Sequence, residues 1–354
     1  MHMADALLAP AVAATMYVAS GTTVGLSIKK LTKDENQAKL PTMAVSAALV
    51  FAGQMINYTI PGTGSSGHLC GGMLLSALLG SQAGFLSMVV ILAIQCLFFA
   101  DGGLMALGAN CWNMAFYGCF VGYFLIWRPI MKSRWFESKG EKAAIRLKII
   151  IASILGCVVT LQLGAFSVVL ETSLSGITEL PFGAFCALMQ PIHLAIGLVE
   201  GLVTSAVLVF VFESRPELLQ EINNTGKSGE GKLSLKTTII VIAVVAALVG
   251  GVFSLFASSN PDGLEWALFG NAEEGYAENM ALDEEDYGVS SKAADTAASV
   301  QDTTAFLPDY AFANSESAVG TSVSGIVGSV MVAGVAVGIC LLGGFFRKKK
   351  AKTA

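Results

Sequence analysis

Residues 68–82 read HLCGGMLLSALLGSQ, and whether this stretch crosses a membrane decides the fold. The stretch is apolar, but it is shorter than the roughly 20 residues that span a bilayer as a helix. Eight longer apolar runs surround it, at about 6–28, 40–57, 84–100, 110–127, 146–168, 187–212, 236–257 and 324–346. The chain therefore has eight or nine crossings, and length alone does not separate the two counts.

The composition is that of an integral membrane protein. Of the 354 residues, 54% are hydrophobic and 13% are charged, whereas about 25% are charged in soluble domains. The net charge of −5 excludes a generally basic nucleic-acid-binding protein, because no excess of Lys and Arg is available to neutralise phosphates. The seven cysteines contain no C-x-x-C pair, so no zinc ribbon is indicated. The sequence predicts an all-α, polytopic protein of the cell membrane.

The distribution of Lys and Arg decides the number of crossings. If the N-terminus lies outside and residues 68–82 cross, only Lys292 of the 21 basic residues falls outside the cytoplasm. Cytoplasmic loops of membrane proteins are enriched in Lys and Arg. If the short segment does not cross, the basic loop 128–148 falls outside instead. We therefore predict nine spans, an outer N-terminus, a cytoplasmic C-terminus, and a short third helix shielded from lipid by protein.

The predicted spans divide into two parts. Residues 1–213 hold seven spans in close succession and predict a seven-helix bundle. Residues 214–235 are polar and contain glycines, and we expect them to form a cytoplasmic linker. Residues 236–354 hold two further spans, separated by an acidic loop at about 258–322.

The acidic loop holds half of the 26 Asp and Glu residues and a single Lys. This composition predicts a solvated, partly disordered extracellular segment. A short helix is expected near 261–269, with Asn260 as its N-cap and Pro261 at its first position. Cation binding by the loop is less favoured, because nothing in the sequence orders these carboxylates around an ion.

The chemistry of the chain centres on its second residue. The sequence contains no Walker A, G-x-S-x-G or H-E-x-x-H motif, so it predicts neither ATP hydrolysis nor an enzyme. His2 is one of only three histidines. If Met1 keeps a free amine, that amine, the deprotonated amide nitrogen of His2 and His2 Nδ1 close adjacent five- and six-membered chelate rings. Three coplanar nitrogens suit Cu(II) or Ni(II), with Co(II) as a further candidate.

A square plane needs a fourth donor, and His68 lies in the loop GTGSSGHLCGG, residues 62–72. In the predicted topology this loop shares the outer face with Met1, and its glycines allow an irregular backbone. The sequence therefore predicts a metal site formed by Met1, His2 and His68. In the alternative interpretation His2 is a frayed terminal residue and His68 caps a loop; the motif alone leaves both open.

Four other residues are weighed as functional candidates. His193 and Glu200 share one face of the seventh span, about 10 Å apart along its axis. An intramembrane carboxyl is costly and marks a candidate site, whereas for His193 we favour a satisfied polar contact between helices. Met3 and Cys70 neighbour the predicted metal site, and we favour packing over ligation for both.

The chain resembles the CbiM/NikM family, the substrate-binding membrane components of energy-coupling factor (ECF) transporters for cobalt and nickel. The resemblance rests on MHMADALLAP (1–10), on GTGSSGHLCGG (62–72) and on QPIHLAIGLVEGLVT (190–204). In addition, NPDGLEWAL (260–268) is similar to the PDGLE domain, a counterpart of the small CbiN/NikN component. The resemblance covers nearly the whole chain, as a fused protein.

The resemblance implies a seven-helix fold and Ni(II) or Co(II) as the transported substrate, held by Met1, His2 and His68. It also implies two kinds of separate partner: an ECF transmembrane coupling component and ECF ATPase subunits. An autonomous secondary metal transporter or metal/proton antiporter is the competing hypothesis, and a metal sensor that moves no ion is a third.

Overall fold

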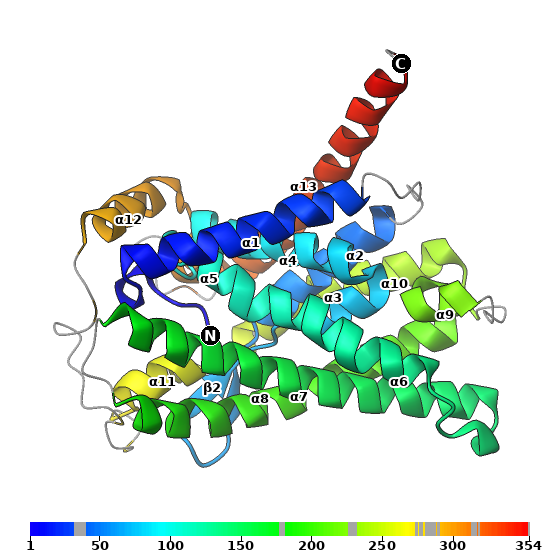
Figure 1. Ribbon diagram of the computed structural model, residues 1–354, viewed down its shortest axis with the longest axis horizontal. Coiled ribbons are helices and arrows are strands. Elements are labelled where there is room, and N and C mark those ends of the chain that lie inside the picture. Colours follow the sequence, from blue (N-terminus) through cyan, green and yellow to red (C-terminus); the bar gives the residue numbers. More distant parts are fainter. Residues whose placement is uncertain are drawn as a thin grey trace.

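The computed structural model describes residues 1–31, 40–176, 181–225, 232–272, 275, 279, 288, 291–312, 317 and 319–352. Seven helical stretches among them are long and apolar enough to cross a membrane. They are α1 (Pro10–Leu31), α4 (Ser81–Phe99), residues 107–132, α7 (Glu141–Ser175), α8 (Phe182–Ser214), α10 (Leu235–Gly251) extended by η6 (Phe253–Phe256), and α13 (Val319–Lys352). The chain is therefore an all-α, multi-pass membrane protein, as predicted (Figure 1).

The stretch 107–132 is one continuous helix made of three segments. It begins with α5 (Leu107–Asn110), continues through the π-helical η3 (Cys111–Trp127) and ends with α6 (Arg128–Lys132). Two of the predicted runs form shorter helices, α2 (Leu40–Gln54) and α3 (Gly72–Leu79).

The first helix begins later than the hydropathy predicted. The apolar run starts near residue 6, whereas α1 starts at Pro10, where a fixed φ and a missing N–H suit the first helical position. The preceding residues form the one-turn helix η1 (Asp5–Leu7) and an extended stretch. Leu7 and Leu8 are fully buried, so this apolar segment packs inside the bundle.

Helix α3 lies inside the protein. All eight of its residues are buried, which confirms the predicted shielding of this short helix. It starts shortly after His68 and ends at Gly80, where an added Cβ would lie 3.6 Å from the side chain of Gln220. At its start, the backbone of Gly72 packs directly against the backbone of Gly118 in η3. The two lie so close that a Cβ on Gly118 would be 2.9 Å from Gly72 Cα.

The contact between Gly72 and Gly118 predicts a specific stability effect. Gly118→Ala inserts a methyl group against backbone atoms that cannot rotate away, and overpacking costs roughly 1–3 kcal/mol. Gly21→Ala, in the middle of α1, is the control, since nothing lies within 4 Å of its added Cβ. Thermal unfolding in detergent should show a lower midpoint for Gly118→Ala alone; equal midpoints would contradict the close packing.

The predicted linker is partly ordered. It contains the one-turn helix η5 (Pro216–Leu218) and α9 (Gln220–Thr225), while residues 226–231 lie outside the described ones. The polar composition of this segment predicted that it would break helices. Leu219 and Ile222 are nevertheless buried, and they anchor the segment to the protein. Buried Glu221 accepts a hydrogen bond from Tyr123 Oη (2.8 Å) and pairs with Arg128 (3.4 Å) and Lys132 (3.5 Å).

The second part packs on the first through α10 and α13, which contact each other and α2. Part of the acidic loop is helical: one helix lies where a short helix was expected near 261–269, and two further helical segments were not predicted. It forms α11 (Gly263–Phe269), α12 (Lys292–Thr304) and η7 (Pro308–Tyr310). Buried Gln301 of α12 explains part of this order, because it donates to the backbone oxygens of Cys96 (3.0 Å) and Gly102 (2.9 Å) on the bundle.

The predicted N-cap of the short helix was wrong. Asp262, not Asn260, caps α11. Its carboxylate accepts hydrogen bonds from the backbone N–H groups of Leu264 (2.7 Å) and Glu265 (3.0 Å). The Glu265 carboxylate accepts in return from Asp262 N (3.2 Å). This reciprocal capping box satisfies more free N–H groups than a cap at residue 260 would.

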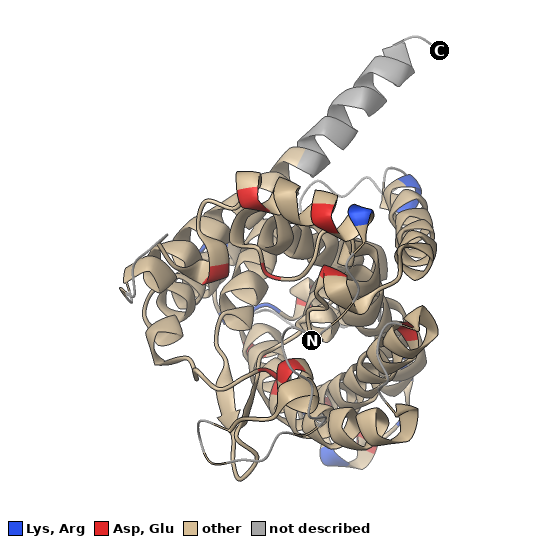
Figure 2. Cartoon of the chain, turned by 90° about the vertical axis from the view of Figure 1, so that its left-hand side faces the viewer, with Lys and Arg blue, Asp and Glu red and all other residues tan. Residues whose placement is uncertain are grey.

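The two ends of the bundle differ. A short antiparallel hairpin of β1 (Tyr58–Ile60) and β2 (Ser65–Gly67) lies at the same end as the N-terminus, α11 and α12, whereas α6 and α9 lie at the other (Figure 1). Viewed onto the first end, the N-terminus sits near the middle of the ring of helices (Figure 2). The N-terminal segment and the hairpin that precedes His68 are therefore brought to one place.

Candidate metal site at the N-terminus

The N-terminal segment is held inside the bundle by hydrogen bonds to its backbone. Met1 is 4% exposed and Met3 is fully buried. Asn110 fixes Met3 from both sides: its Oδ1 accepts from Met3 N (2.8 Å) and its Nδ2 donates to Met3 O (3.2 Å). Gly103 N also donates to Met3 O (2.9 Å). These bonds satisfy a buried, non-helical backbone and fix where the chain begins.

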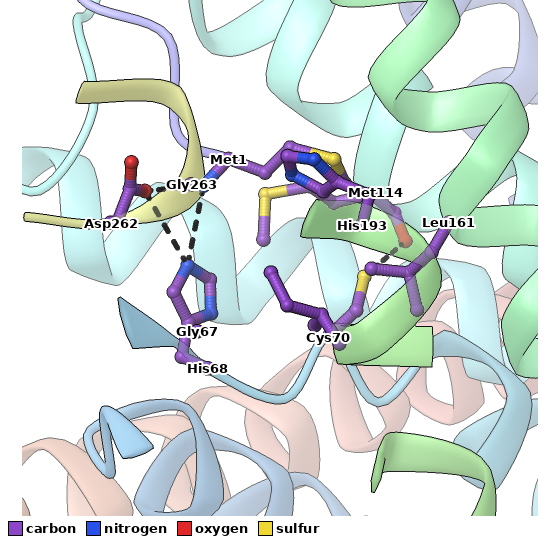
Figure 3. Close-up of a pocket in the computed structure, with 10 residues that line it drawn as sticks. Met1, Gly67, His68, Cys70, Met114, Leu161, His193, Asp262 and Gly263 are labelled. Atoms are coloured by element: carbon purple, nitrogen blue, oxygen red, sulfur yellow. Dashed lines mark hydrogen bonds and ion pairs between the residues drawn. The ribbon is translucent and has the colours of Figure 1, made fainter. Parts of the chain in front are cut away.

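The Met1 amine lies between two side chains from distant parts of the sequence (Figure 3). Its nitrogen is 3.4 Å from His68 Nε2, across 67 positions of sequence. It also forms an ion pair with Asp262 Oδ2 at 2.5 Å, across 261 positions. The structure thus brings together two of the three predicted ligands, and a carboxylate that the sequence did not indicate.

His2 is close by, but its ring has other partners. Its Nδ1 lies 3.2 Å from Asp101 Oδ1 and its Nε2 lies 3.3 Å from Gln95 Oε1. The His2 and His68 rings stack, with centroids 5.2 Å apart and planes inclined by 21°. Closing the predicted chelate therefore requires His2 Nδ1 to leave Asp101.

His68 is positioned by the hairpin before it and the backbone after it. Ser66 of β2 donates its N–H to Pro261 O (2.8 Å), which ties the loop to the segment that carries Asp262. His68 Nδ1 lies 3.1 Å from Leu69 O. A carbonyl only accepts, so Nδ1 carries the proton and Nε2 presents its lone pair towards Met1.

Glu200 of α8 holds the backbone that follows His68. Its carboxylate accepts from Cys70 N (2.7 Å) and Gly71 N (2.9 Å), and the side chain is only 2% exposed. Gly71 adopts φ +85°, and a Cβ there would come within 2.3 Å of Val50. The buried carboxylate, a functional candidate in the sequence, therefore positions the loop that carries His68.

The electrostatic surroundings keep both imidazoles unprotonated. Burial, followed by the charge of the Met1 amine, lowers the pKa of His68 to about 3. Burial also lowers the pKa of His2, against the opposing effect of Asp101. Burial alone would raise the pKa of Asp262, but the Met1 amine and His68 outweigh it and hold that pKa below its usual range. Two neutral imidazoles and one carboxylate thus face the site at neutral pH.

The remaining candidates occupy the surroundings of the site. Met3 Sδ lies 3.6 Å from Asn113 Nδ2, and Cys70 Sγ donates to Met114 O (3.1 Å), so both sulfurs have partners within the bundle. His193 lines the same pocket as Met1 and His68, together with Cys70 and Asp262. Among the described residues, no three His, Cys, Asp or Glu side chains converge closely enough to hold an ion by themselves.

Sequence reasoning missed Asn110, Asp101, Gln95 and Asp262. The first three were visible as isolated polar residues in or beside apolar runs, where burial demands a partner. Asp262 stood in the recognised NPDGLEWAL motif, but nothing along the chain pointed from that motif to Met1.

The ion pair between Met1 and Asp262 predicts an effect on the reactivity of the amine. Asn caps helices as well as Asp, so Asp262→Asn should preserve α11 while removing the charge that holds the amine. Hydrogen bonds to charged groups contribute about 1.5–3 kcal/mol, so acetylation of the Met1 amine should accelerate by about tenfold or more. Mass spectrometry of the N-terminal peptide measures this; Glu217→Gln, at a partly buried ion pair with Arg215, is the control. An unchanged rate would argue against the ion pair.

Comparison with protein families agrees with the geometry. Residues 2–218 match the CbiM family model, described as "cobalt uptake substrate-specific transmembrane region". Residues 236–343 match the PDGLE domain. The two matches meet at the site, because His68 lies in the first match and Asp262 in the second, and Met1 directly precedes the first.

Two of the relatives are described as fused transport proteins. The chain is 33% identical, over 96% of its length and 98% of the relative's, to a putative fused nickel transport protein NikMN of Archaeoglobus fulgidus. It is 31% identical over 62% of its length, and 64% of the relative's, to the fused nickel transport protein NikMN of Rhodobacter capsulatus. A crystal structure of a truncated transition metal transporter is 30% identical and superimposes with a TM-score of 0.51, covering 60% of this chain and 99% of that one. The chain therefore belongs to the CbiM family, with a PDGLE domain fused behind it, and is a multi-pass membrane transport protein rather than an enzyme.

Proposed function

We propose that the chain is the substrate-binding membrane component of an ECF importer for Ni(II) or Co(II). In this proposal the Met1 amine, the His2 amide nitrogen, His2 Nδ1 and His68 Nε2 form a square plane around the ion. The observation that carries the proposal is the distance of 3.4 Å between the Met1 nitrogen and His68 Nε2. Four nitrogens, one of them a deprotonated amide, suit a square-planar Ni(II) ion.

Loading the ion requires two exchanges. His2 Nδ1 exchanges Asp101 for the metal, and the Met1 amine exchanges its pairing with Asp262 for a bond to the metal. The ammonium and the His2 amide each lose a proton as the ion binds. The protein thus holds the ligands close to their final places by polar contacts that the ion replaces.

The contents of the two ends support the proposed orientation. The end that carries the N-terminus, the hairpin, α11 and α12 lies outside, and the end with α6 and α9 faces the cytoplasm (Figure 1). The basic residues Arg128 and Lys132, at the second end, support this direction through the positive-inside tendency. The path of α3, from the neighbourhood of His68 to Gln220 of α9, supports a third crossing and so nine spans in all.

Transport energy comes from separate chains in this proposal. The sequence contains no Walker A motif, so an ECF coupling component and ATPase subunits supply the ATP-driven step. Residues 1–213 form the substrate-binding part and 236–354 the PDGLE part. The segment 214–235, with Glu221 paired to Arg128 and Lys132, joins them on the cytoplasmic side.

The test is nickel and cobalt accumulation by cells that express the chain with its partner subunits. His2→Ala and His68→Ala should each abolish accumulation, whereas Thr296→Ala, on the exposed side of α12, should leave it unchanged. Undiminished accumulation in both His variants would refute the site. Uptake by the purified chain alone in liposomes, driven by a proton gradient, would instead support a secondary transporter.

A further inference from the structure

His193 has one ring nitrogen with a partner and one without. Its Nδ1 lies 2.8 Å from Met189 O, four residues earlier on α8. A carbonyl only accepts, so Nδ1 carries the proton and donates it. Nε2 is buried and, among the described residues, has no hydrogen-bond partner, although the side chain is only 1% exposed. A buried polar atom without a partner is costly and requires an explanation.

The free nitrogen belongs to a ring that lines a small pocket. The pocket is lined by Met1, His68, Cys70, Asp262 and His193, and has room for about one water molecule (Figure 3). Gly263 closes it beside the ring, because a Cβ there would lie 3.1 Å from His193 Cε1. The pocket therefore places the His193 ring next to two of the proposed ligands.

His193 and His68 are prepared in the same way. In each ring Nδ1 donates to a backbone carbonyl, Met189 O or Leu69 O, and Nε2 keeps its lone pair. This is the usual arrangement of metal-binding histidines, in which the second nitrogen fixes the ring and its tautomer. His2 differs, because Asp101 and Gln95 engage both of its nitrogens and it does not line the pocket.

We propose that the ion first enters this pocket and binds between His68 Nε2 and His193 Nε2, before His2 completes the square plane. The inference rests on the proposed function and adds a loading position and a ligand, His193, to it. Asp262, which also lines the pocket, provides a negative charge beside the entering cation. In the transfer, His2 leaves Asp101 and the Met1 amine leaves Asp262, and the ion exchanges His193 for these ligands while it keeps His68.

The loading position should bind weakly. No three potential ligands converge there among the described side chains, so the two imidazoles are the only protein ligands proposed for the ion at this position. Two imidazoles without the amide nitrogen give no chelate ring, which favours fast exchange over high affinity. A weak first position next to a strong final one allows the ion to enter before the N-terminus rearranges.

The test removes the His2 imidazole, which the final square plane needs and the loading position does not. The Met1 amine and the amide nitrogen of residue 2 stay in place, so substitutions of His193 in this background identify the loading position. The chain is purified with a free N-terminus and a tag that contains no histidine, and nickel chloride is titrated calorimetrically. His2→Ala should lose the high-affinity site but retain a weak one. Adding His193→Asn to His2→Ala should weaken that remaining site by at least about tenfold, the smaller end of what outer-shell partners contribute to metal sites.

Two substitutions separate ligation from a structural role. Asn places an amide where His193 has Nδ1, so it can keep the bond to Met189 O, but it has nothing at the position of Nε2. Gln reaches towards the position of Nε2 and gives up that bond. A ligand role predicts that His193→Asn is as damaging to weak nickel binding as His193→Ala, with His193→Gln less so. A structural role predicts instead that His193→Asn, which keeps the bond to Met189 O, is less damaging than His193→Gln and His193→Ala.

X-ray absorption gives an independent reading, because the chain has only three histidines. Nickel on His2→Ala should show two imidazoles, and one after His193→Asn is added. Absence of weak binding in His2→Ala, or weak binding indifferent to His193, would overturn the loading position and leave the proposed function intact. Equal high affinity in the unsubstituted chain and in His2→Ala would instead refute the proposed function itself.

Discussion

Lengthening the chain by one residue before Met1 is expected to abolish high-affinity nickel binding. The extension converts the amine into an amide, which lacks a basic lone pair and breaks the first chelate ring. It also has no room, because Met1 is 4% exposed and its nitrogen lies against His68 and Asp262. The loss should exceed the roughly 10–100-fold that removal of an outer-shell partner costs at metal sites.

Calorimetry with nickel chloride measures this loss on the purified, untagged chain. The matched control carries the same extra residue after Ala354, far from the site in sequence. The thermal unfolding midpoint separates loss of a ligand from loss of the fold. If the N-terminally extended chain binds nickel as tightly as the control, the amine is not a ligand and the proposed site is wrong.

The second large effect concerns Glu200. Glu200→Ala leaves the N–H groups of Cys70 and Gly71 buried without their acceptor. Each such group costs about 1–3 kcal/mol, so the free energy of unfolding should fall by roughly 2–6 kcal/mol. The loop that carries His68 loses its anchor at the same time, and nickel affinity should fall with it.

Glu200→Gln should cost about half as much, because the amide keeps one accepting oxygen and turns an NH₂ group towards the other N–H. The control is Glu213→Gln, which breaks more exposed pairs with Arg146 and Lys232 and should cost less than about 1 kcal/mol. Thermal unfolding and nickel calorimetry on the same samples measure both quantities. Glu200→Ala with unchanged nickel affinity would show that the loop is positioned by other contacts.

Much of the fold could be predicted because a bilayer constrains the chain strongly. Apolar runs gave the long helices. The distribution of Lys and Arg predicted that the short stretch 68–82 crosses the membrane, which stays a prediction, and the structure shows that its helix α3 is buried in the bundle. The start of α1 was placed too early because hydropathy does not distinguish an apolar helix from an apolar segment buried in another conformation. Leu7 and Leu8 are such residues, and Pro10 was the signal that marked the true start.

The site was predictable where its chemistry is local. Met1 and His2 are adjacent, so their chelate rings follow from the sequence, and the glycines around His68 indicated a close approach of the backbone. The contacts of Asp262, Asp101 and His193 depend on which helix ends meet in space, which no local pattern encodes. The order of α12 was missed for the same reason, since Gln301 finds its partners on the bundle, far away in sequence.

The ion pair between Met1 and Asp262 also has a consequence for biosynthesis. The charged partner of the Met1 amine lies 261 positions later in the sequence, so the pair cannot form until residue 262 has been made. The opening segment therefore waits, apolar and unseated, while the helices that enclose it are inserted. During this interval the amine lacks the ion pair that engages it in the folded chain, so we expect it to be more open to acylation before α11 folds than afterwards.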